Sequence, residues 1–238
     1  RVDHVVYSVA VQTDGKILLG GYTGDSGFGS TLGKGVWRIN ADGSLDTTFD
    51  TQIAALESVW SIALQTDGKI LIGGGFSAVN GISRRALARL NANGSLDTTF
   101  TPNIGGLSTS KIVVQPDGKI IVGGGFTTVN GSPIANVVRL NQDGSVDTSF
   151  NIGGGANNSV TAILVLPDSK IYLGGTFSSF NGISRRSLVR LEANGTVDEA
   201  FAPNLSSGVN AIVRLPNKKI VVGGAVTANA DASPRQKI

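Results

Sequence analysis

The stretch Gln65–Phe76, QTDGKILIGGGF, decides the fold of this chain. It predicts the end of one strand, a tight turn at Asp67-Gly68-Lys69, a second apolar strand, and a glycine run that ends on an aromatic residue. Asp-Gly between two apolar runs is the strongest short signal for a β-hairpin. The phrase recurs at Gln12–Tyr22, Gln115–Phe126, Leu166–Phe177 and Leu215–Val226. A unit repeated in this way predicts a repeat architecture.

The spacing of the repeat indicates its size. The turn lysines Lys16, Lys69, Lys119, Lys170 and Lys219 follow one another at intervals of about 50 residues. One propeller blade of four antiparallel strands needs about that length. We therefore predict an all-β fold, a β-propeller of four-stranded antiparallel blades with about five repeats present, four of them complete.

Each repeat divides into four strands, a to d, and no stretch has helical periodicity. Strand a has no polar face and is placed innermost, because a strand without a polar face is buried on both sides. The predicted strands a are Tyr7–Val11, Trp60–Leu64, Ser110–Val114, Thr161–Val165 and Asn210–Arg214; strands b are Lys16–Gly20, Lys69–Gly73, Lys119–Gly123, Lys170–Gly174 and Lys219–Gly223; strands c are Val36–Ile39, Leu87–Leu90, Val137–Leu140 and Leu188–Leu191; strands d are Leu45–Phe49, Leu96–Phe100, Val146–Phe150 and Val197–Phe201.

The repeats favour one cooperative array over independent domains. We predict a single domain, 1–238, with units at 7–58, 59–108, 109–159, 160–208 and, in part, 209–238. The fifth unit stops where its strand c should start, and residues 1–6 are too few to supply the missing strand. We therefore expect the sequence to be a fragment of a longer array or assembly, or to have a cut tail.

Composition excludes several classes of protein. The chain is 40% hydrophobic and 16% charged, and no apolar run approaches the roughly 18 residues of a membrane helix, so an integral membrane protein is not expected. A net charge of +3 without a basic run argues against nucleic-acid binding. The absence of cysteine excludes disulfides and thiolate sites, and a single histidine, His4, argues against a histidine metal site or a Ser-His-Asp triad.

The acidic residues are better explained by turns and ion pairs than by chemistry. The pattern N-x-D-G-S-x-D at Asn40–Asp46 suggests a calcium loop, but its glycine is misplaced and no distal glutamate follows. We expect no cofactor, with calcium at these Asx-rich turns as the less favoured alternative. A three-residue turn would place Arg38 opposite Asp46, a cross-strand pair that recurs in each unit. The turn lysines are expected to be solvated.

Departures from the repeat are where we look for a binding site, since shared positions serve the fold. Strand a begins with Tyr7 or Trp60 in the first two units and with Ser, Thr or Asn later. The links between strands b and c diverge at Thr23–Lys34 and at two arginine pairs. In a propeller these features would gather on one rim, and basic pairs there could accept an acidic glycan or protein, although solvated charge is the simpler interpretation. The candidate partner-binding residues are Tyr7, Trp60, Arg84, Arg85, Arg185 and Arg186; no catalytic or metal-binding residue is proposed.

The sequence resembles the delta-60 repeat, a bacterial β-propeller family related loosely to kelch blades. The residues that carry the resemblance in one copy are Asp67-Gly68-Lys69-Ile70, Gly73-Gly74 and Asn93-Gly94-Ser95-Leu96-Asp97 through Phe100. The first unit departs in its long loop and the fifth breaks off early. The resemblance implies a long secreted or surface-anchored bacterial protein, and it attaches no common enzymatic activity.

These observations lead to a first hypothesis and two alternatives. We expect a non-catalytic extracellular or cell-surface propeller that mediates protein or glycan contacts, as part of a larger bacterial surface, adhesion or filament-associated protein. The first alternative is a lectin-like propeller, although the variation among Tyr7, Trp60, Ser110, Thr161 and Asn210 argues against equivalent sugar pockets. The second, a carbohydrate-active enzyme, needs two carboxylates within about 10 Å at the channel mouth.

Overall fold

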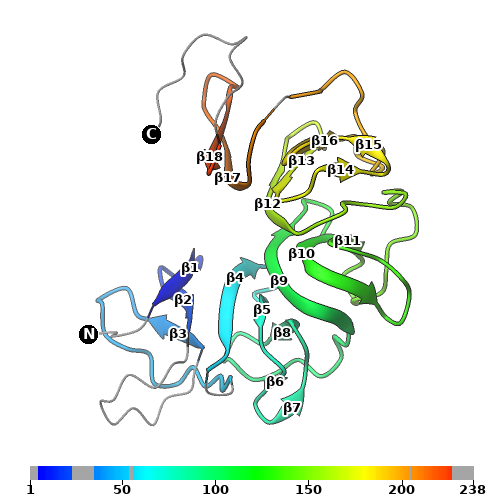
Figure 1. Ribbon diagram of the computed structural model, residues 1–238. Helices are drawn as coiled ribbons and strands as arrows, with labels where there is room; N and C mark the ends of the chain where they lie inside the picture. Colours follow the sequence, from blue (N-terminus) through cyan, green and yellow to red (C-terminus); the bar gives the residue numbers. More distant parts are fainter. Residues whose placement is uncertain (1–4, 23–34, 54–55, 204, 227–238) are drawn as a thin grey trace.

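The computed structural model describes residues 5–22, 35–53, 56–203 and 205–226, and all of the helix- or strand-type structure in these ranges is β-strand. The sheets follow one another along an arc, as in a propeller (Figure 1). None of the described residues belongs to a helix long and apolar enough to cross a membrane. The strands are β1 (Val6–Val11), β2 (Ile17–Gly21), β3 (Val36–Ile39), β4 (Ser58–Leu64), β5 (Ile70–Gly75), β6 (Ala78–Val79), β7 (Ile82–Ser83), β8 (Leu87–Leu90), β9 (Ile104–Val114), β10 (Ile120–Val129), β11 (Val137–Leu140), β12 (Val160–Val165), β13 (Ile171–Gly175), β14 (Ser179–Phe180), β15 (Ile183–Ser184), β16 (Leu188–Leu191), β17 (Val209–Arg214) and β18 (Ile220–Gly224).

Each of the first four units forms an antiparallel sheet from strands a, b and c, as predicted. In the second unit the order is β4-β5-β8, and the a–b hairpin closes with Gln65 N donating to Lys69 O (2.9 Å). Gly68 has φ 82° in this turn, which explains why a glycine stands there. The corresponding sheets are β1-β2-β3, β9-β10-β11 and β12-β13-β16, and the described part of the fifth unit is the β17-β18 hairpin.

The fourth strand of each blade is shorter than predicted. Instead of a strand over Leu96–Phe100, the structure has one bridge, from Leu96 to Leu90. The Oδ1 atom of Asp97 accepts hydrogen bonds from the backbone N (3.0 Å) and the hydroxyl (2.6 Å) of Thr99, and Phe100 N donates to Asp97 O. These hydrogen bonds of Asp97 turn the backbone immediately after the bridge at Leu96. The hydrogen-bonded ladder between strands c and d therefore cannot continue. The other complete units behave in the same way, with bridges Ile39–Leu45, Leu140–Val146 and Leu191–Val197.

The Asn-Gly pairs between strands b and c form small hairpins. Asn80 and Gly81 have φ of 50° and 75°, the left-handed conformations that a two-residue type I′ turn requires. This turn joins β6 to β7, and Asn181-Gly182 joins β14 to β15 in the same way. The long loop Thr23–Lys34 of the first unit lies outside the described residues, as does His4.

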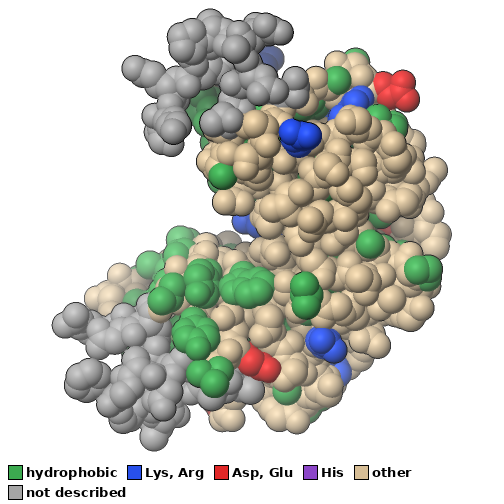
Figure 2. Space-filling model, in the orientation of Figure 1, with side chains coloured by type: hydrophobic (Ala, Val, Ile, Leu, Met, Phe, Trp, Pro, Cys, Tyr) green, Lys and Arg blue, Asp and Glu red, His purple; other side chains and the backbone are tan. Residues whose placement is uncertain are grey.

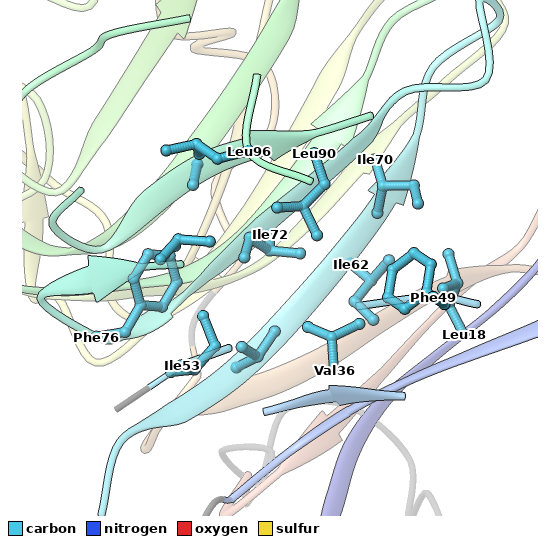
Figure 3. Packing of buried hydrophobic residues seen from close by; sticks show 13 residues of the cluster. Leu18, Val36, Phe49, Ile53, Ile62, Ile70, Ile72, Phe76, Leu90 and Leu96 are labelled. Atoms are coloured by element: carbon cyan, nitrogen blue, oxygen red, sulfur yellow. The ribbon is translucent and has the colours of Figure 1, made fainter. Parts of the chain in front are cut away.

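The core lies between neighbouring sheets. Figure 3 shows side chains of the first unit, including Leu18, Val36 and Phe49, packed against Ile62 and Ile70 of the second. The fit depends on the glycine pair of strand b. A Cβ placed on Gly73 would lie 2.6 Å from Thr109 Cγ2 and 2.8 Å from Ile112 Cδ1 of the next blade. Only glycine allows the two sheets to approach this closely.

Candidate functional site

The most strongly organised polar group in each blade is an aspartate held by two cations. In the second unit, Asp97 Oδ2 accepts from Arg89 Nε (2.8 Å) and Lys69 Nζ (2.6 Å), while its Oδ1 accepts from Thr99. The aspartate and the arginine side chains are only 5% and 8% exposed. The arginine–aspartate pairing predicted from the turn length is therefore present. The same group recurs at Lys16–Arg38–Asp46, Lys119–Arg139–Asp147 and Lys170–Arg190–Asp198.

The turn lysines differ from the sequence prediction. They were expected to be solvated, but four of the five bind the aspartate of strand d in their own blade. The cause is the register: strand b begins at the turn, and the c–d hairpin brings the aspartate to that end of the sheet. A signal existed in the sequence, since a lysine and an aspartate 28 residues apart recur in three consecutive units.

Three of the four strand-c arginines also connect their blade to the next one, whereas Arg190 donates to the Tyr172 hydroxyl of its own blade. The guanidinium of Arg139 lies 4.3 Å from the ring centre of Phe150, and its Nη1 donates to the carbonyl of Ala193 in the following blade (2.8 Å). Arg38 and Arg89 donate in the same way to the carbonyls of Ala92 and Gln142. A guanidinium that is stacked, ion-paired and hydrogen-bonded at once is a structural element that lysine could not replace.

These carboxylates are poorly suited to proton transfer at neutral pH. Burial alone would raise the pKa of Asp97, but hydrogen bonds from Lys69, Thr99 and Arg89 outweigh it and hold the pKa well below its usual range. In the third blade burial would likewise raise the pKa of Asp147, but hydrogen bonds from Lys119, Ser149 and Arg139 lower it. A general acid or base works best with a pKa near the operating pH, so the repeated aspartates fit a structural role.

This arrangement predicts a pH dependence of stability. The hydrogen bond from Lys170 outweighs burial and, with Arg190, lowers the pKa of Asp198 from 3.8 to about 2. A pKa that is lower in the folded state gives stability that is present above pH 3.8 and lost as the pH falls toward 2. The thermal midpoint should therefore fall between pH 4 and pH 2, and it should fall less in Asp198→Asn. Parallel curves for the two proteins would contradict this prediction.

The Asx-rich turns use their oxygens internally. Asp42 Oδ1 accepts from the backbone N (2.9 Å) and the hydroxyl (2.6 Å) of Ser44, which lowers the pKa of Asp42. Asn93 makes the same two bonds to Ser95, so the carboxylate charge is not needed there. No group of three or more acidic or histidine side chains that could hold a metal is found among the described residues. The expectation of no cofactor stays a prediction.

Two candidate residues, Tyr7 and Trp60, lie on neighbouring inner strands. They begin equivalent segments of β1 and β4, which are in contact on the concave side of the arc (Figure 1). Tyr7 is 51% exposed and Trp60 37% exposed, which is high for large aromatic side chains. Figure 2 shows hydrophobic side chains gathered over these first blades. At the equivalent place in the fourth blade, Thr161 donates its hydroxyl to Val209 O, so that position is occupied by a structural contact.

The arginine pairs lie elsewhere, directly after the hairpins β6–β7 and β14–β15, which are on the outer side of their blades (Figure 1). Within each pair the two residues differ. Arg84 is half-buried and donates to Ser83 O (2.8 Å), and Arg185 donates to Ser184 O (3.0 Å). Arg85 and Arg186 are exposed, and their side chains have no hydrogen bond or ion pair within the described part of the chain. The arginines thus lie on the outer side of their blades and Tyr7 and Trp60 on inner strands, and the gathering of all of them on one rim stays a prediction.

A family model matches the chain in four stretches, residues 12–49, 65–100, 115–150 and 166–201. Each stretch begins at the a–b hairpin and ends at the phenylalanine that follows the strand-d bridge, and together they cover more than half of the chain. The family is described as "Domain of unknown function (DUF5122) beta-propeller". The chain belongs to this family. One matched stretch of the DUF5122 model lies within each of the first four predicted units. No curated protein matches the chain.

Solved structures resemble this DUF5122 chain in fold. PorZ, a bacterial surface component of the type-IX secretion system of Porphyromonas gingivalis, is 15% identical with a TM-score of 0.55, and the match covers 93% of this chain and 31% of PorZ. A protein described as a candidate gluconolactonase is 13% identical with a TM-score of 0.54, over 92% of this chain and 71% of that protein. The extracellular domain of BT4673 from B. thetaiotaomicron has a TM-score of 0.44, 12% identity, and coverage of 92% and 31%. The chain thus spans about a third of PorZ and of the BT4673 extracellular domain.

Proposed function

We propose that this DUF5122 chain is a non-catalytic, extracellular propeller that binds a protein partner as part of a larger bacterial surface protein. The observation that carries the proposal is the exposure of Tyr7 and Trp60 on adjoining inner strands. Tyrosine and tryptophan are enriched in the energetically dominant part of protein interfaces. The proposal extends to the repeat type, which we take to be the delta-60 repeat, and to a role in adhesion or filament association.

A surface location is supported by a similarity of fold and by composition. PorZ, whose fold is similar over nearly the whole of this chain, is a surface component of a bacterial secretion system. The absence of cysteine and methionine from the sequence is also typical of extracellular repeat proteins. We propose the same compartment for this chain, without transferring the function of PorZ.

The non-catalytic role is supported by the state of the repeated acids. The strand-d aspartates of all four complete blades are paired with cations, and two of the turn acids cap their own turns. A glycosidase would need two carboxylates free to meet across a substrate. A carbohydrate-active enzyme, as the fold of the candidate gluconolactonase allows, is therefore the less favoured function.

A protein partner is favoured over a glycan by the neighbours of Trp60. The neighbouring strand β1 exposes Val9 and Val11 as well as Tyr7, at 60% and 65%. Such a surface offers area for apolar burial, whereas a sugar also requires several placed hydrogen-bonding groups. The lectin-like alternative remains the second candidate, since Trp60 could also stack on a sugar.

The experiment compares Trp60→Ala with Ser110→Ala, its counterpart in the third blade. Both are tested on a glycan array and in a pull-down from the native cell surface. Loss of an interface tryptophan costs about 2 kcal/mol or more, so capture by Trp60→Ala should fall about 30-fold, with Ser110→Ala unchanged. Equal capture by the two variants would refute the aromatic site. Loss of capture in the double variant Arg85→Ala/Arg186→Ala alone would move the site to the outer side.

A further inference from the structure

The first blades connect their inner strands through a serine. An inner strand pairs on one side only, so alternate N–H groups on its other edge, toward the concave side of the arc, have no partner in the sheet (Figure 1). Ile62 N donates to Ser8 Oγ of the first blade (3.0 Å), and Ile112 N donates to Ser61 Oγ of the second (3.0 Å). Because an unpaired buried N–H group is costly, each serine stabilises the inner edge of the following blade.

The third blade has a lysine at this position. Lys111 lies opposite Gly123, the first glycine of the strand-b pair, as the two serines lie opposite theirs. An ammonium group cannot accept a hydrogen bond, and Ile163 N of the fourth blade has no acceptor among the described residues. The fourth blade also lacks the serine, but it has a small and buried residue there, Ala162. A charged side chain at this position is therefore not explained by the packing of the blades.

Lys111 is exposed and isolated from other charges. Its side chain has no hydrogen bond or ion pair within the part of the chain that the structure describes. It is the single charged residue in the inner strands β1, β4, β9 and β12 as described. Complete sheets lie on both sides of β9, so the surroundings of Lys111 are the same whatever precedes or follows these blades. A lone cation on a neutral concave wall attracts anionic groups.

The exposed aromatic residue of the second blade, Trp60, is a neighbour of Lys111. Trp60 and Lys111 directly precede Ser61 and Ile112, the two residues that the hydrogen bond of 3.0 Å joins. The Trp60 ring lies over the backbone of its own blade, since a Cβ on Gly75 would be 3.4 Å from its Cη2 atom, and the residue is 37% exposed. An aromatic ring and an ammonium group thus stand next to each other on the same wall.

We propose that Lys111 determines the specificity of this propeller for its protein partner by receiving a carboxylate of that partner. The inference rests on the proposed function, in which the partner buries Trp60. The partner presents an aspartate or glutamate beside a large apolar residue. The apolar side chain packs on Trp60 and the carboxylate pairs with the Lys111 ammonium. Complementary charge of this kind selects an acidic partner and rejects a basic one.

The probe is a library of random peptides displayed on phage and selected on the immobilised full chain. We expect the selected sequences to be enriched in aspartate or glutamate beside a large apolar residue. A selected peptide is synthesised together with a copy in which the acid is replaced by its amide, and both are titrated into the protein by calorimetry. Lys111→Gln should weaken binding of the acidic peptide about tenfold, because a charge pair is lost, and should leave binding of the amide copy unchanged.

Two further variants separate the charge from the fold. Lys111→Ser removes the charge and introduces the serine of the first two blades, which gives Ile163 N an acceptor. It should weaken binding of the acidic peptide about tenfold without lowering the thermal midpoint. A lower thermal midpoint would assign Lys111 a structural role and overturn the proposal. Lys218→Gln, which removes an exposed lysine from the a–b turn of the fifth unit, should leave binding unchanged.

The outcome for Trp60→Ala distinguishes this proposal from the proposed function. Peptides that need Trp60 but bind equally to the wild type and to Lys111→Gln would refute the role of Lys111 and leave the aromatic site intact. Peptides that need Lys111 but not Trp60 would support the charge site and refute the aromatic one. A selection without acidic residues would overturn the proposal. Displacement of the peptide by an oligomer of galacturonic acid, but not by a neutral glucose oligomer, would assign Lys111 to an acidic glycan instead.

Discussion

Replacing Gly74 with alanine should prevent the second blade from forming its a–b hairpin. A Cβ at Gly74 would lie 2.0 Å from the backbone oxygen of Ser58 and 2.9 Å from Val59 Cα. These are backbone atoms of the paired strand, so no side-chain movement can relieve the overlap. Overpacking of this kind costs about 3 kcal/mol or more. Urea unfolding followed by circular dichroism should show a chain that is strongly destabilised or unfolded.

The next residue is the control for this prediction. A Cβ at Gly75 would meet the Trp60 ring at 3.4 Å, which is ordinary contact, and neither glycine has positive φ. Gly75→Ala should therefore change the free energy of unfolding by no more than about 0.5 kcal/mol. If Gly74→Ala proved as stable as Gly75→Ala, strand b would not lie as close to strand a as the structure shows.

Asp97→Asn should give the second large effect. The substitution leaves Arg89, which is 8% exposed, without its counter-ion, and it weakens the bond to Lys69. Removing one partner of a buried ion pair costs about 3 kcal/mol, since the remaining charge stays buried. The free energy of unfolding at neutral pH should fall by that amount in a denaturant titration.

Asp67→Asn is the matched control in the same blade. Asp67 accepts from Lys69 N at 3.1 Å, and Asn217 accepts from Lys219 N at the same distance in the fifth unit. The turn therefore functions with either side chain, and Asp67→Asn should be close to neutral. If Asp97→Asn and Asp67→Asn lowered the free energy of unfolding equally, the Lys69–Arg89–Asp97 group would contribute no more than the loss of one negative charge anywhere in the blade.

Much of the fold could be predicted because each turn and strand signal recurs in several repeats, so that one copy supports the assignment of the others. Strands c were predicted to the residue, since Val36–Ile39 and Leu87–Leu90 stand between clear turn signals. Strand d was overestimated. Its pattern from Leu96 to Phe100 fits a strand, but the hydrogen bonds of Asp97 to Thr99 compete locally with the ladder.

The candidate site could be predicted only in part. The aligned starts of strand a identified Tyr7 and Trp60, which the structure leaves exposed. The arginine pairs were identical in sequence, yet Arg84 folds back on its own blade while Arg85 does not. The sequence alone cannot distinguish Arg84 from Arg85, because their difference in burial arises from the direction in which each side chain leaves the backbone after the β6–β7 hairpin. The role of Lys69 was missed because its partner is 28 residues away.

The contacts of the strand-c arginines bear on how a chain of this kind changes length. Arg38, Arg89 and Arg139 each reach a carbonyl in the next blade, at separations of 54, 53 and 54 residues. Because the arginine contact recurs in the first three units and the glycine contact in the first four, gene duplication of one whole unit from among the first three would recreate both of its interfaces without any compensating substitution. An insertion of any other length would break them. Growth or loss by entire repeats is thus the change that the contacts between blades tolerate best.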